Sequence, residues 1–92
     1  MTEGQDTRDA ADAMGDARMR FHRALLQSHR LRGFFDELDD AASSFCLLLK
    51  QLGYSPEQTL IDAKKVIDDA LEGHDIPTAE RAVLMCIQQY YK

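Results

Sequence analysis

The sequence has only two cysteines, and their positions exclude a C-x-x-C redox motif and a zinc site. Cys46 and Cys86 belong to no C-x-x-C motif, and no histidine has the spacing of a zinc ligand set. Both cysteines fall in apolar helical patterns. We therefore expect two buried, reduced thiols rather than a disulfide.

The sequence also lacks long hydrophobic runs. No stretch of about 18 apolar residues is present, so no membrane-spanning helix is expected. The first 30 residues contain no hydrophobic segment typical of a signal peptide. Together with the expected reduced thiols, this predicts a cytoplasmic protein. The net charge of -5 argues against non-specific nucleic-acid binding by the whole chain.

Motifs that carry chemistry are missing as well. There is no glycine-rich phosphate loop and no Glu-x-x-His motif, and residues close in the sequence form no Ser/His/Asp or Cys/His arrangement. His22 and His29 lie about two helical turns apart, too far to share a metal without other ligands. The acidic cluster at residues 36–40 lacks the spacing of a calcium loop and is interpreted as a solvated helix face. We expect no enzyme activity, no cofactor and no metal.

The most regular feature of the sequence is a stripe of apolar residues between positions 31 and 52. Leu31, Leu38, Phe45 and Leu52 recur every seven residues, which predicts a long central helix ending at Gly53. Other segments must cover such a stripe. The predicted core consists of Leu31, Leu38, Phe45, Leu49, Leu52, Leu60, Ile67, Val83 and Ile87.

The chain before this stripe divides into two parts. Residues 1–16 are acidic and are expected to form a leader that is partly ordered at best, whereas residues 17–92 form the helical domain. The heptad phase of residues 10–24 continues into the central helix, so one very long helix is possible. A break or kink near Gly33 is favoured, because glycine costs about 1 kcal/mol inside a helix.

Two further helices follow Gly53. Ser55 has the position of an N-cap, with Pro56 at the first helical residue and Gln58 at the third. Gly73 ends that helix, and Asp75 or Thr78 caps the last one. The sequence thus predicts an all-α protein, a small antiparallel bundle of three to four helices with short connections.

The last helix is apolar on nearly every side at residues 82–87, which in so short a chain favours cover by another subunit. We therefore predict a non-catalytic protein–protein interaction or regulatory module, plausibly a homodimer, that binds a second copy or another protein. The residues expected to mediate self-association are Phe34, Phe35, Leu84, Met85 and Tyr91.

Charge is distributed unevenly. No acid occurs between Ala17 and Phe35, where five arginines form an Arg-rich strip over residues 18–32. The strip either meets an acidic partner, through Arg18, Arg20 and Arg23, or pairs with acids of the chain itself or of a second subunit. The alternative function is therefore a signalling or nucleic-acid adaptor that uses this strip.

One further pattern combines Leu31-Arg32, residues 53–57 (GYSPE) with Leu60 and Lys64, and residues 86–87 and 90–91 (CI and YY). In this pattern residues 31–91 resemble a class of small, uncharacterised bacterial all-helical proteins, which implies a fold but no activity. The segment 52–57 (LGYSPE) is also similar to the turn of ubiquitin-associated-like three-helix domains, which are compact binding modules.

Overall fold

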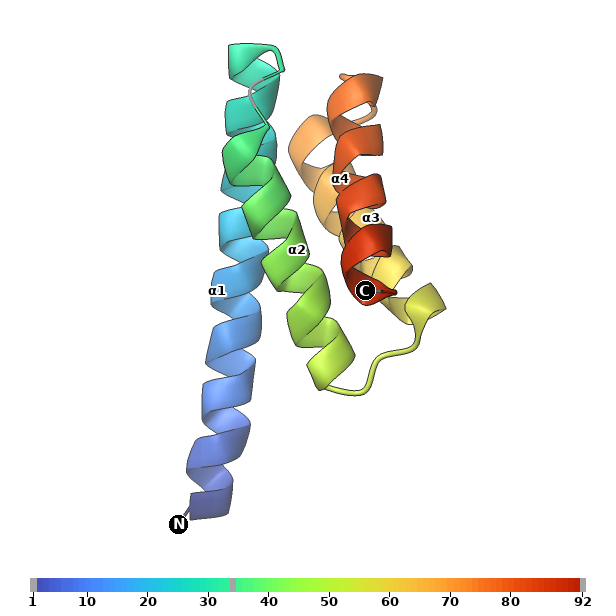
Figure 1. The fold of residues 1–92 in the computed structure, drawn as a ribbon. Helices are drawn as coiled ribbons and strands as arrows, with labels where there is room; N and C mark the ends of the chain where they lie inside the picture. Colours follow the sequence, from blue (N-terminus) through green and yellow to red (C-terminus); the bar gives the residue numbers. More distant parts are fainter. Residues whose placement is uncertain (1, 34, 92) are drawn as a thin grey trace.

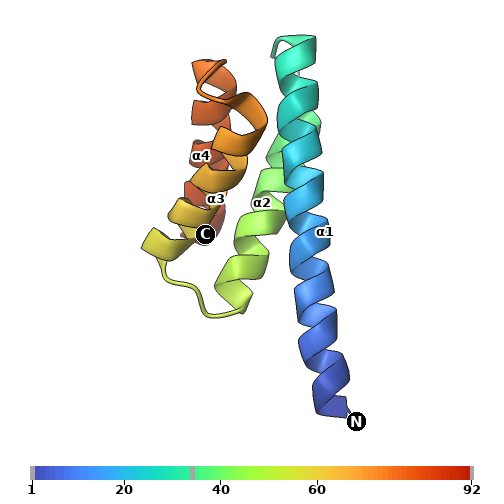
Figure 2. The ribbon, with the colours of Figure 1, turned by 180° about the vertical axis from the view of Figure 1, so that it is seen from behind.

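The computed structural model describes the backbone of residues 2–33 and 35–91, and the side chains of residues 12–33 and 35–91. This part of the chain forms four helices and no strand: α1 (Thr2–Leu31), α2 (Asp36–Gln51), α3 (Pro56–Leu71) and α4 (Ile76–Tyr90). In Figure 1 α1 rises from the N-terminus, α2 descends beside it, α3 rises again and α4 returns to the C-terminus. Figure 2 shows the same order from behind, with α1 extending well beyond the other three helices.

The helix ends follow local sequence signals. Gly33 has a φ of 107°, which side chains other than glycine rarely adopt, so the predicted break near this residue is confirmed. Ser55 accepts a hydrogen bond from the backbone N–H of Gln58 at 3.1 Å, as expected for the N-cap of α3. Asp75 accepts from the N–H of Thr78 at 3.3 Å and caps α4.

The core lies where all four helices meet. Phe21 of α1 and Phe45 of α2 are fully buried, with ring centroids 5.2 Å apart. Leu38 and Leu49 of α2 are also inaccessible to solvent, and Ile67 of α3 is nearly so. The predicted core positions on the middle of α2 and α3 are therefore confirmed.

Three predicted core residues are not buried. Two of them lie at the ends of the apolar stripe, which does not form one continuous helix. α2 begins at Asp36 and has 16 residues, whereas α1 has 30, so the longest helix precedes the predicted one. Leu31 ends α1 with 52% exposure, and Leu52 follows α2 with 42%. Ile87 faces outward from α4 and is 38% exposed. Leu60 and Val83 are half-buried against the core.

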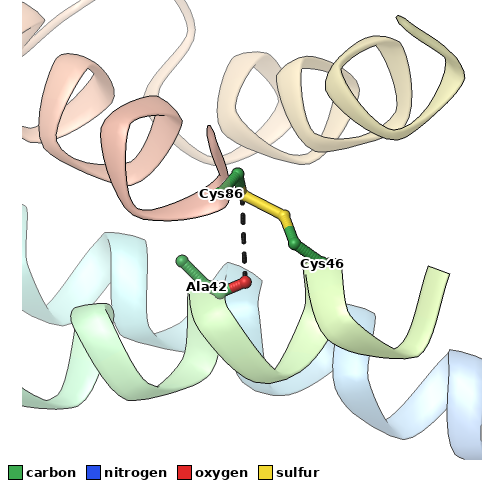
Figure 3. The surroundings of a disulfide bond; sticks show 3 residues. All are labelled: Ala42, Cys46 and Cys86. Atoms are coloured by element: carbon green, nitrogen blue, oxygen red, sulfur yellow. Dashed lines mark hydrogen bonds between the residues drawn. A yellow bond between two sulfur atoms is a disulfide. The ribbon is translucent and has the colours of Figure 1, made fainter. Parts of the chain in front are cut away.

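The expectation of reduced cysteines is wrong. Cys46 and Cys86 are fully buried, as predicted, but they form a disulfide that joins α2 to α4 (Figure 3). The packing of these two helices brings the two Cα atoms within 5.4 Å, inside the range that a disulfide requires. Cys86 Sγ also lies 3.8 Å from the carbonyl oxygen of Ala42. A disulfide sulfur carries no proton, so this contact can become a hydrogen bond only after reduction.

α1 crosses the expected leader boundary at residue 16 without interruption. Met14 is the first described side chain of α1 that packs against the core. At 1.5 Å per residue α1 is about 45 Å long, which matches the longest dimension of the molecule, 46 Å. In the described part of the chain, no helix is both long and apolar enough to span a membrane.

Candidate apolar interaction groove

An apolar groove of about 400 Å³ runs between α3 and α4. Its walls are aliphatic, and both signs of charge occur at its edges through Lys64, Asp68 and Glu80. The aliphatic lining residues are Ile67, Ala79, Val83, Leu84 and Ile87. Along α4 these residues span about two and a half turns, which is enough to contact a short helix.

Exposed aliphatic side chains border this groove. Leu84 and Ile87 both line the groove, and they are 45% and 38% exposed. The spacing of residues 84, 87 and 91 places Tyr91, which is 70% exposed, further along the same side of the helix. The groove and these side chains are apolar surface that the described chain leaves exposed.

The structure separates the residues predicted for self-association. Leu84 and Tyr91 are exposed on this face. Met85 and Phe35 are half-buried and pack against the core. Phe35 precedes the first residue of α2, whereas Tyr91 follows the last residue of α4. Phe34 lies outside the described residues. Ile87, which the sequence analysis assigned to the core, belongs instead to the exposed face.

The Arg-rich strip does not form one flat basic surface. Successive residues of a helix point about 100° apart, so Arg18, Arg20 and Arg23 face different directions. Arg20 turns toward α2, where its guanidinium pairs with Asp40 and lies 3.5 Å from Glu37. The hydrogen bond to Asp40 raises the pKa of Arg20.

Arg18 and Arg23 have weaker contacts. Arg18 borders a pocket between α1 and α3 that includes Val66 and Asp69. Arg23 contacts the sulfur of Met19 at 3.6 Å. Within residues 12–33 and 35–91, neither arginine has an ion pair.

Part of the acidic cluster at residues 36–40 is used inside the molecule. Arg81 of α4 donates two hydrogen bonds to Asp39, at 2.9 Å and 2.6 Å, which raise its pKa. Its guanidinium also lies over the ring of Phe35, 5.7 Å from the ring centroid. The sequence analysis placed these acids on a solvated face and missed this link, since nothing local to Asp39 indicates a partner 42 residues away.

A second concave site lies at the end of the bundle where α1 meets the α3–α4 turn. Asp75 Oδ2 lies 2.8 Å from His29 Nδ1 and accepts a hydrogen bond from the Thr78 hydroxyl at 2.7 Å. Burial raises the pKa of Asp75, but the hydrogen bonds from Thr78 and His29 together lower it below the ordinary carboxyl value. The adjoining pocket, about 600 Å³, is also lined by Arg32 and Phe35. The contact with His29 fixes α1 to the start of α4, whereas the contacts with Thr78 lie within the first turn of α4.

In the described part of the chain, no three histidine, cysteine, aspartate or glutamate side chains are placed to hold a metal ion. Comparisons with protein-family models, with curated proteins and with solved structures gave no match. The interpretation of the groove therefore depends on its own geometry.

Proposed function

We propose that this small antiparallel bundle is a non-catalytic protein-interaction module that binds an apolar helix of a partner protein in the α3–α4 groove. The observation that carries the proposal is the groove itself, with Leu84 and Ile87 exposed along one wall. Amphipathic helices bind such grooves through aliphatic anchors at positions i, i+3 or i+4, and i+7. Contiguous exposed apolar surface of this kind is typical of interaction sites.

The edges of the groove support a helix rather than a small molecule as its ligand. The groove is open along its length, and its polar groups are charged side chains at the edges, not donors or acceptors converging inside it. Lys64 on α3 and Glu80 on α4 are placed to contact polar residues on either side of a bound helix. Such charges at the edge of an interface contribute more to orientation than to affinity.

A phage-displayed library of helical peptides provides a direct test. Panning on the immobilised protein is expected to enrich peptides that carry aliphatic or aromatic residues at helical i, i+4 and i+7 spacing. The double substitution Leu84→Glu with Ile87→Glu should weaken their binding at least about tenfold, because two anchors of the wall become charged. Both side chains are partly exposed, so the bundle should keep its helical circular dichroism.

Ile76→Glu is the matched control. Ile76 is an equally apolar residue of α4, is 63% exposed and does not line the groove. It should leave peptide binding unchanged. The proposal is wrong if panning enriches no peptide with this spacing, or if the enriched peptides bind the groove variant as well as the native protein.

A further inference from the structure

A second surface of the molecule, distinct from the groove, lies on the outer side of α1. It faces away from the core residues Phe21 and Leu25. Six of its residues are spaced by four and three in strict alternation, which is the spacing of a coiled-coil seam. All six are exposed: Asp12, Asp16, Met19, Arg23, Leu26 and Arg30. We call these six residues the α1 outer stripe.

The order of charges along the stripe is self-complementary. Acids occupy its N-terminal end, at residues 12 and 16, and arginines occupy positions 23 and 30 toward its C-terminal end. Met19 and Leu26, which are 54% and 37% exposed, supply apolar contacts between the charges. Two parallel copies would place like charges opposite each other, whereas two antiparallel copies bring the acidic end of each stripe beside the arginine-bearing end of the other.

Nothing in the described part of the same chain neutralises the stripe. Arg20, one residue beyond Met19, is paired with Asp40, but no ion pair among residues 12–33 and 35–91 involves Asp12, Asp16 or Arg30. Arg23 has only the weak contact with the sulfur of Met19. The charges of the stripe are therefore available to a partner.

We propose that two copies of this chain pair along the α1 outer stripe in antiparallel orientation. A two-fold axis midway between Met19 and Arg23 sets Asp12 opposite Arg30 of the second copy. Asp16 then lies opposite Leu26 of that copy, three residues from its Arg23 and four from its Arg30. The remaining helices of each copy lie on the far side of its own α1, so the bundles do not obstruct the pairing. The length of α1, about twice that of α2, extends the surface available for this contact.

An acidic protein of another kind or a nucleic acid is a poorer fit to this surface. A phosphate backbone would use the arginines but not Met19 or Leu26, and it would be repelled by Asp12 and Asp16. A second copy uses all six residues at once. The contact should weaken as salt is added, because exposed charges are screened over about 10 Å at 0.1 M ionic strength.

Sedimentation equilibrium of the full chain tests this pairing through charge exchange. One variant carries Asp12→Lys and Asp16→Lys, which makes every charge of the stripe positive. The other carries Arg23→Glu and Arg30→Glu, which makes every charge negative. Each variant alone should dissociate at least about tenfold more readily than the native dimer, and an equimolar mixture should again form dimers.

Control variants reverse charges at and near the two ends of α3, outside the groove: Glu57→Lys with Glu72→Lys, and separately Lys65→Glu. These three side chains are exposed, and their reversal should leave the association unchanged. Circular dichroism checks that every variant remains folded.

Three results would overturn the proposal. The native chain could remain monomeric at low salt and high concentration. Reversal of the stripe charges could leave the dissociation constant of the dimer unchanged. The two variants, once mixed, could fail to associate. Duplex DNA binding that is lost with Arg23→Glu and Arg30→Glu, in a chain that does not dimerise, would assign the arginines to nucleic acid instead.

Discussion

Two threonines illustrate how equally buried residues can have opposite energetic effects. Thr59 and Thr78 are each 1% exposed. The hydroxyl of Thr78 donates to Asp75, whereas the hydroxyl of Thr59 is buried and has no hydrogen-bond partner among the described residues. A buried hydroxyl without a partner costs about 1–3 kcal/mol of desolvation free energy.

Replacing each threonine with valine should therefore change stability in opposite directions. We expect Thr59→Val to raise the free energy of unfolding by about 1 kcal/mol, because the shape is kept and the unpaired hydroxyl is removed. Thr78→Val should lower it by a similar amount, because Asp75 loses a donor. Urea unfolding of the two variants measures both changes. A destabilised Thr59→Val protein would indicate that its hydroxyl has a partner in solution.

Asp75 should give the stability a dependence on pH. Its pKa is lower in the folded protein than the ordinary value of 3.8, so the folded state binds this proton less readily than the unfolded state. Its stabilising contribution is thus complete above the ordinary pKa and is lost as the pH falls through the lower pKa of the folded state. Asparagine can still cap the helix but lacks the charge, so the native protein should be about 1 kcal/mol more stable than Asp75→Asn at pH 7, and this advantage should shrink below about pH 4. Urea unfolding across this range measures it, and a difference independent of pH would refute the assigned role.

At the scale of helices, the disulfide is the strongest single link between α2 and α4. Its cysteines are 40 residues apart, and closing a loop of that length removes entropy from the unfolded chain worth about 4 kcal/mol. Cys46→Ala with Cys86→Ala should lower the free energy of unfolding by about this amount in the absence of reductant. The helices should persist, because the surrounding core is otherwise unchanged.

The native chain in reductant is the natural comparison, and it should approach the stability of the double alanine variant. Intact-mass measurement of the purified protein checks the bond itself, since the disulfide lowers the mass by two hydrogens. Two alkylatable thiols in the unreduced protein would contradict this account. Disulfides are typical of oxidising compartments, so the prediction of a cytoplasmic location loses the part of its support that came from reduced cysteines.

Sequence patterns located most of these elements because the signals are local. The break at Gly33 and the serine cap at Ser55 depend on neighbouring residues, and the structure confirms both. For the cap of α4 the sequence left Asp75 and Thr78 open, and the structure shows Asp75. The pairing of Cys46 with Cys86 depends on which faces of α2 and α4 meet, and no local pattern contains that information.

The site was only partly predictable for the same reason. Leu84 and Tyr91 were expected to be available for contacts, and both are exposed. Ile87 was expected in the core but is exposed, since residues 82–87 are apolar on nearly every side of α4 and periodicity cannot show which side faces α3. The strip of arginines was likewise visible in the sequence. Only the packing of α1 against α2 shows that Arg20 pairs within the molecule, whereas Arg23 and Arg30 lie on the outer side of α1.

At the scale of the whole molecule, the described residues bury one core, and two of the surfaces that they leave exposed carry the proposals made above. One is the apolar α3–α4 groove, and the other is the charged α1 outer stripe. Two copies of a chain with net charge -5 repel each other overall, so the proposed pairing depends on how the charges are arranged along the stripe.

Amide chemical shifts of the native protein, compared between high and low concentration at low salt, test this account most directly. The account predicts concentration-dependent shifts along α1 between Asp12 and Arg30, and none in the groove residues of α3 and α4. Shifts confined to the groove, or no change at any residue over the whole concentration range, would contradict it.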